Sequence, residues 1–122
     1  MMALGKIKAD TLEHSTAGSL DTQYVVSGSA KASANADDAA SLQDSKNVSS
    51  GTDNGTGNYT YALSSAMSNS NFVVSATAHA GGSKNVVFDP QNASSFVLET
   101  FTTSNDTNSN AAHAFAVHGD LA

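Results

Sequence analysis

The stretch GTDNGTGNYTYAL, residues 51–63, carries the clearest fold signal in the chain. Its Asn54-Gly55 pair readily adopts the positive φ angles of a tight hairpin turn. After this pair, Tyr59 and Tyr61 alternate with smaller residues, which is the period of two of a strand with one buried face. The stretch therefore predicts a β-hairpin whose second strand packs on a core.

The same alternation recurs towards the C-terminus. It is found in FVVSATAHA (72–80), in SFVLETFTT (95–103) and in AAHAFAVHG (111–119). A shorter apolar run, Val86–Phe88, predicts a brief strand that Asp89-Pro90 should end. Turn-forming Gly, Asn, Asp and Ser residues separate these segments, as they do in small all-β domains.

The residues before the hairpin give weaker signals. Tyr24-Val25-Val26 predicts the opening of a strand that continues to Ala32, and residues 46–50 predict another short strand. Between them, residues 34–45 are acidic and short of large side chains, and we interpret them as a loop or a weak strand. Six or seven short strands result, so residues 22–122 are predicted to form a small antiparallel β-sandwich of the Ig-like or jelly-roll-like type.

Residues 1–21 precede this domain and have little patterning. After the two methionines their sizeable apolar side chains are Leu4, Ile7 and Leu12, at a spacing that fits neither a helix nor a strand. A disordered tail and a short helix over Ala9–His14 are two interpretations. We favour an extended arm that docks onto another subunit through these three side chains.

Composition excludes several functions. The formal net charge is -6 and arginine is absent, so the chain lacks the cations that nucleic acids or anionic membranes require. It has no cysteine, no apolar run of membrane-spanning length and no cleavable signal peptide that we can identify. Only 39% of the residues are hydrophobic, many of them alanine, and such a thin core favours self-association or docking.

Catalytic and metal-binding patterns are weak. The histidines are His14, His79, His113 and His118. His113 and His118 are five residues apart and would face opposite sides of one strand, so they cannot share an ion by themselves, and a metal site would need symmetry to gather one histidine from each copy. The start of a calcium loop at Asp53 lacks the later acidic ligands. No nucleophile elbow, P-loop or zinc-protease motif occurs, so we expect neither an enzyme nor a cofactor.

Three long phrases carry a family resemblance. They are GKIKADTLEHSTAGSLDTQYVVSGSAKA (5–32), NVSSGTDNGTGNYTYALSSAMSNSNFVVSATA (47–78) and AFAVHGDLA (114–122). In these phrases the chain resembles short structural proteins of tailed bacteriophages, especially podoviruses of marine and cyanobacterial hosts, which often carry a tail-fibre annotation. The resemblance implies a β-rich, non-enzymatic protein on the virion surface, assembled in the host cytoplasm.

Two placements on the virion remain open. In the favoured one, the arm anchors a capsid-decorating knob or head fibre to the major capsid protein or another virion protein, and copies self-associate. In the alternative, a tail-fibre or tail-tip subunit binds a host surface glycan or receptor through its loops. The candidate loop contacts are Asp53, Asn54, Tyr59, Tyr61, Asn105 and Asp106.

Overall fold

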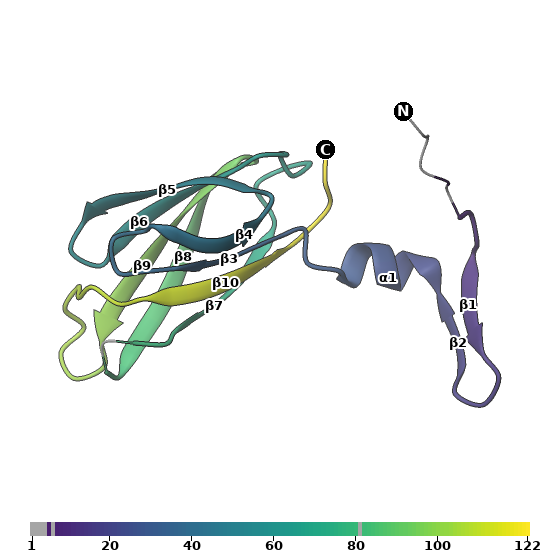
Figure 1. The fold of residues 1–122 in the computed structure, drawn as a ribbon, viewed down its shortest axis with the longest axis horizontal. Coiled ribbons are helices and arrows are strands. Elements are labelled where there is room, and N and C mark those ends of the chain that lie inside the picture. Colours follow the sequence, from purple (N-terminus) through teal and green to yellow (C-terminus); the bar gives the residue numbers. More distant parts are fainter. Residues whose placement is uncertain (1–4, 6, 81) are drawn as a thin grey trace.

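The computed structural model describes residues 5, 7–80 and 82–122, and it divides into an N-terminal group of elements and a β-sandwich (Figure 1). The N-terminal group consists of β1 (Thr11–His14), β2 (Gly18–Asp21) and α1 (Thr22–Gly28). The sandwich consists of β3 (Ala32–Ala36), β4 (Leu42–Lys46), β5 (Val48–Gly55), β6 (Asn58–Leu63), β7 (Val73–Ala78), β8 (Lys84–Asn92), β9 (Ser95–Thr102) and β10 (His113–His118). The predicted all-β antiparallel sandwich is therefore confirmed.

Two four-stranded sheets form the sandwich. One has the order β4-β3-β10-β7 and the other has the order β5-β6-β9-β8, and every strand pairing within them is antiparallel. The central strands β3, β10, β6 and β9 bury alternate residues, as the period of two in their sequences requires. The core thus lies between the two sheets.

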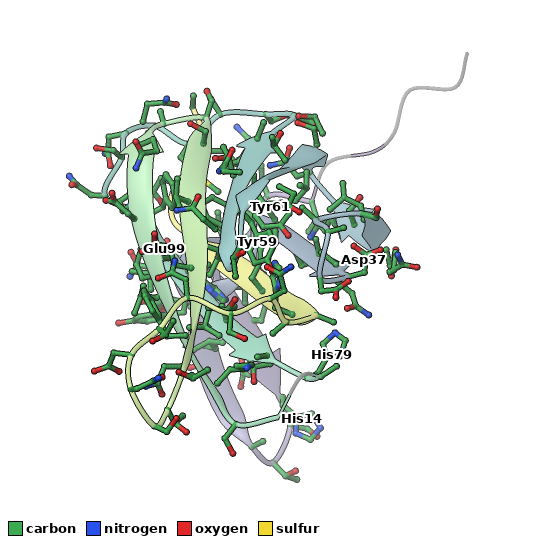
Figure 2. All side chains as sticks on the ribbon, turned by 90° about the vertical axis from the view of Figure 1, so that its left-hand side faces the viewer. His14, Asp37, Tyr59, Tyr61, His79 and Glu99 are labelled. Atoms are coloured by element: carbon green, nitrogen blue, oxygen red, sulfur yellow. The ribbon has the colours of Figure 1, made fainter. Side chains whose placement is uncertain are left out.

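Aromatic side chains fill this core. The ring of Phe115 lies 4.6 Å from the ring of Tyr61 and 5.1 Å from that of Phe96, measured between centroids. Such aromatic pairs contribute about 0.5–1.5 kcal/mol beyond the area that they bury. Figure 2 shows Tyr59 and Tyr61 between the sheets. The largest fully buried side chains are Tyr59, Tyr61, Phe96, Met67, Leu98, His113, Val117 and Thr100.

The predicted hairpin of residues 51–63 is confirmed, with its turn two residues further on. Gly55 pairs with Asn58, which leaves Thr56-Gly57 as the two-residue connection. Gly55 and Gly57 both have positive φ angles, of 127° and 64°, so the turn uses glycine where other residues would be strained.

The predicted strand from Tyr24 to Ala32 is wrong, because Thr22–Gly28 is the helix α1 and the first sandwich strand begins at Ala32. Tyrosine and valine favour strands, but a strand also needs a neighbour for its backbone hydrogen bonds. Residues 22–28 have none, and a helix satisfies its backbone internally. The alternative helix over Ala9–His14 is also wrong, since Thr11–His14 forms β1.

Two further predictions need correction. The run Val86–Phe88 does not end at Asp89-Pro90, because β8 continues to Asn92. Proline is tolerated there since β8 is an edge strand and one side of it needs no hydrogen-bond donors. Residues 34–45 contribute to two strands, β3 and β4, joined by a turn in which the Asp37 carboxylate accepts hydrogen bonds from the backbone of Ala39 and Ser41.

Candidate functional site

The N-terminal group, which we call the N-terminal appendage (residue 5 and residues 7–28), projects from one end of the sandwich (Figure 1). Strands β1 and β2 pair as an isolated antiparallel hairpin, and no residue of β1, β2 or α1 is buried. A two-stranded hairpin without a buried face is at best marginally stable in water. The appendage therefore has secondary structure without a core of its own.

Apolar side chains on the appendage face solvent. Ile7 is 94% exposed, Val26 is 66% exposed and Tyr24 is 60% exposed. The exposed large apolar residues of the appendage are Ile7, Leu12, Leu20, Tyr24, Val25 and Val26. Large apolar groups that gather on one exposed element are typical of a surface that packs on a partner.

The predicted arm is not extended over residues 11–21, because these residues fold back as the β1–β2 hairpin, and its docking role stays a prediction. Ile7 and Leu12 are described and exposed, whereas Leu4 lies outside the described residues. Tyr24, Val25 and Val26 were missed as surface residues because their β propensity suggested a core strand.

A shallow groove runs between the hairpin and α1. Its apolar wall includes Ile7, Leu12, Val25 and Val26. The backbone N–H of Thr22 donates to the carbonyl of Asp10 at 2.9 Å and so holds the start of the helix against the start of the hairpin. The groove thus brings apolar side chains of the hairpin and the helix, with that of Ile7, onto one surface.

The other end of the sandwich, which we call the distal end, gathers four connections. These are the β3–β4, β5–β6, β7–β8 and β9–β10 connections, which lie away from the appendage in Figure 1. Gly57 N–H donates to Asn110 Oδ1 at 2.7 Å and links the β5–β6 turn to the β9–β10 loop. The Tyr59 hydroxyl donates to the Asp38 carbonyl at 3.2 Å and ties the β3–β4 turn to the same cluster.

Four of the six predicted loop contacts are exposed at this end. Asp53 and Asn54 lie at the tip of β5, and Asn105 and Asp106 lie in the β9–β10 loop. The structure thus brings together two loops that are some fifty residues apart in sequence, and Asn110 is the linking residue that the sequence did not single out. The sequence signal for that link is limited to one asparagine among many in the loop.

Tyr59 and Tyr61 are wrong as loop contacts, because both side chains are 0% exposed. They belong to the inward face of β6, where the alternation places them, and their hydroxyls bond to groups inside the domain. The four exposed positions therefore carry carboxylate or amide side chains, and no aromatic side chain is exposed among the six predicted contacts.

A buried polar pair lies below the distal end. Nδ1–H of His113 donates to the Ala111 carbonyl at 2.8 Å, so its Nε2 is free to accept the Tyr61 hydroxyl proton at 2.6 Å. Burial lowers the pKa of His113 and raises that of Tyr61, so both side chains are neutral near pH 7. With no exposed surface on either residue, the pair supports the packing of the sheets and does not reach a substrate.

The histidines do not converge. His14 caps its own turn by accepting hydrogen bonds at Nδ1 from the backbone of Thr16 and Ala17, while Nε2–H of His79 donates to Asn35 Oδ1 at 2.8 Å. Within the described ranges, no group of three or more His, Asp or Glu side chains has metal-binding geometry. In the same part of the chain, no helix is long and apolar enough to cross a bilayer.

Comparisons of the chain with protein-family models, with curated proteins and with solved structures found no significant match.

Proposed function

We propose that this chain is a bacteriophage virion structural protein, a capsid-decorating knob or head-fibre subunit that anchors through its N-terminal appendage. The observation that carries the proposal is the set of exposed apolar side chains on an element with no core of its own. The three phrases that resemble phage structural proteins supply the setting. In this role the appendage binds the major capsid protein or a neighbouring virion protein, and the sandwich projects from the virion surface.

Energetics supports a contact that is repeated many times. Covering the apolar wall of the groove, Ile7, Leu12, Val25 and Val26, contributes on the order of 5–8 kcal/mol before the costs of association are subtracted. A single contact of this kind is weak. A shell that presents many equivalent sites, together with self-association between neighbouring copies, would make attachment stable by multivalency.

The distal loops lie at the end of the sandwich away from the appendage, which favours a second candidate function (Figure 1). In a tail-fibre or tail-tip subunit, the same appendage attaches the chain and the distal loops bind a host surface glycan or receptor. Asp53, Asn54, Asn105 and Asp106 are the exposed contacts in that case. The two candidates share the attachment surface and differ in the position on the virion.

Labelling of intact virions with an antibody against this chain, located by electron microscopy, tests the choice between them. Label over the head supports the decorating subunit, and label confined to the tail supports the fibre subunit. Absence of label from purified virions would contradict both. The antibody should be raised against the sandwich, so that a docked appendage does not hide its epitope.

A binding experiment tests the attachment surface itself. The double variant Val25→Ser/Val26→Ser should fold normally and lose binding to virion shells that lack this chain. The matched control is Val87→Ser, which changes a valine that is 48% exposed on the sandwich, and this variant should bind as the wild type does. Equal binding by both variants would remove the appendage as the anchor.

A further inference from the structure

Asn54 and Gly55 form the sole Asn-Gly pair of the sequence, and both residues are exposed at the tip of β5. In such a pair the backbone nitrogen of glycine can approach the side-chain carbonyl carbon of asparagine, because glycine has no Cβ to hinder it. We propose that Asn54 is a site of spontaneous deamidation and that two hydrogen bonds to β6 control its rate. This inference is independent of the proposed function.

The reaction needs no reagent other than water. The backbone nitrogen of Gly55 bonds to Cγ of Asn54 and loses its proton, while the Cγ–Nδ2 bond breaks and Nδ2 leaves with that proton as ammonia. The resulting five-membered succinimide ring then adds water and opens at one of its two carbonyl groups. The product is aspartate or isoaspartate at position 54.

The carboxylate of Asp53 is placed to assist the first step. Its Oδ1 accepts a hydrogen bond from the Gly55 N–H at 2.9 Å, which is the proton that the reaction must remove. A carboxylate that already accepts this proton increases the nucleophilic character of the nitrogen. Asp53 therefore acts as a local proton acceptor for the ring closure.

Two hydrogen bonds oppose the reaction. Asn54 Nδ2 donates to Asn58 Oδ1 at 2.9 Å and to Thr60 Oγ1 at 2.7 Å, and both acceptors are on the neighbouring strand β6. They anchor the amide over β6, so the side chain must leave them before Cγ can turn towards the Gly55 nitrogen. Ring closure consequently proceeds from states in which the tip has opened locally.

Deamidation would alter the surface of the tip. A carboxylate at position 54 has no N–H groups, so it can no longer donate to Asn58 Oδ1 or to Thr60 Oγ1. Asn58 in turn donates to Glu99 Oε1 at 2.7 Å, so the new negative charge lies next to Asp53 in sequence and one residue away from the Glu99 carboxylate in the hydrogen-bond chain. An isoaspartate also lengthens the backbone of β5 and disturbs its register with β6.

Peptide mass spectrometry of the full chain, incubated at neutral pH and physiological temperature, tests the site. The peptide that contains Asn54 should gain one mass unit before any other asparagine peptide does, and isoaspartate methyltransferase should label it. The native chain should react more slowly than the chain unfolded in urea. Native conversion at Asn54 that is absent, or as fast as in urea, would overturn the proposal.

Matched variants test the control by β6. Thr60→Val keeps the shape of the side chain and removes the acceptor, so conversion should be about fivefold faster, the factor expected for one ordinary hydrogen bond. Thr52→Val changes the residue paired with Thr60 and leaves the bonds of Asn54 intact, so its rate should not change. Asn58→Ala provides a second accelerating variant should Thr60→Val fold poorly. Equal rates in Thr60→Val and Thr52→Val, with both folded, would refute the role of the hydrogen bonds.

Discussion

The Tyr61 hydroxyl lies 2.6 Å from Nε2 of His113, and the two residues belong to different sheets of the sandwich. Tyr61 is on β6 and His113 is on β10, so their hydrogen bond joins the sheets across the core. The bond from His113 Nδ1–H to the Ala111 carbonyl fixes the tautomer in which Nε2 can accept. The pair thus combines packing with a specific polar contact.

Replacement of Tyr61 by phenylalanine should destabilise the domain by about 1–3 kcal/mol, the usual cost of leaving a buried polar atom without its partner. The change removes the hydroxyl and leaves His113 Nε2 unsatisfied, while the ring contacts with Phe115 remain. Urea unfolding followed by circular dichroism measures the loss. Tyr24→Phe, at a tyrosine that is 60% exposed, is the control and should unfold at the wild-type urea concentration. Identical midpoints for the two variants would show that the inter-sheet bond contributes nothing.

Acid should destabilise the fold through His113. Burial lowers the pKa of this histidine below its usual value of 6.5, so the unfolded chain binds a proton more readily than the folded chain does. Stability is therefore complete above pH 6.5 and is lost as the pH falls from there through the folded pKa, with a slope of at most about 1.4 kcal/mol per pH unit. Urea midpoints measured over this range report the effect.

The His113→Gln variant separates this effect from other titrations. Glutamine can accept the Tyr61 hydroxyl and does not titrate, so its stability should be flat where the wild type declines. The Asp37 carboxyl affects stability in a lower pH range, because hydrogen bonds from the backbone of Ser41 and Ala39 lower its pKa below 3.8. Its contribution persists above pH 3.8 and is lost as the pH falls further through the folded pKa. A decline below pH 6.5 in His113→Gln equal to that of the wild type would assign the effect to another group.

The sequence predicted the strands in which buried and exposed residues alternate. Its predictions failed where the presence or order of neighbouring strands decides the structure. Alternation at Tyr59, Tyr61 and Phe115 indicated buried faces correctly, because successive side chains of a strand point to opposite faces of the sheet. Tyr24, Val25 and Val26 also favour a strand, yet residues 22–28 form a helix. Propensity does not reveal whether a partner strand is present. The extension of β8 through Pro90 likewise depends on its edge position, which only the sheet order defines.

For the candidate surfaces too, the sequence predicted which residues are exposed but not which segments lie together. Asp53 and Asn105 were expected in exposed loops because polar turn residues seldom fold inward. Their placement at one end depends on hydrogen bonds such as that from Gly57 to Asn110, which join segments far apart in the chain. The tyrosines of β6 could have been assigned to either the core or a binding surface, and only their burial decided it.

Deletion of residues 1–28 should leave the sandwich folded, with a free energy of unfolding within about 1 kcal/mol of that of the full chain. No residue of β1, β2 or α1 is buried, so the deletion removes no part of the core. Urea unfolding of the two chains makes the comparison. Loss of the cooperative transition in the shorter chain would mean that the appendage supports the sandwich, contrary to its exposed state.

Substitution of Gly57 by alanine should cost about 2–4 kcal/mol, because two independent penalties coincide there. Its φ of 64° disfavours a side chain, and a Cβ would lie 2.5 Å from the Thr100 carbonyl oxygen and 2.7 Å from the Ser109 nitrogen. Gly18→Ala shares the positive φ, at 92°, but its Cβ would meet no atom within 4 Å, and it lies in the appendage. Thermal unfolding should therefore separate the two variants clearly, and equal melting temperatures would contradict the close approach at Gly57.

Asn47 should tolerate glycine better than alanine, although both changes remove the same side-chain contacts. Its Nδ2 donates to the carbonyls of Lys31 and Ser65, each at 3.1 Å, and its Oδ1 accepts from Ser65 N–H at 2.7 Å. The loss of these bonds should cost about 1–3 kcal/mol in either variant. Asn47 also has a positive φ of 56°, in the bend that carries the chain from β4 to β5 and so from one sheet to the other.

Glycine adopts that angle without strain, whereas alanine should lose about 1 kcal/mol more. The difference between Asn47→Gly and Asn47→Ala in urea unfolding thus measures the strain of alanine at this angle, net of the larger conformational entropy that glycine loses on folding, and the loss common to both measures the three hydrogen bonds. If alanine were as stable as glycine, the left-handed bend between β4 and β5 would not be a requirement of the fold.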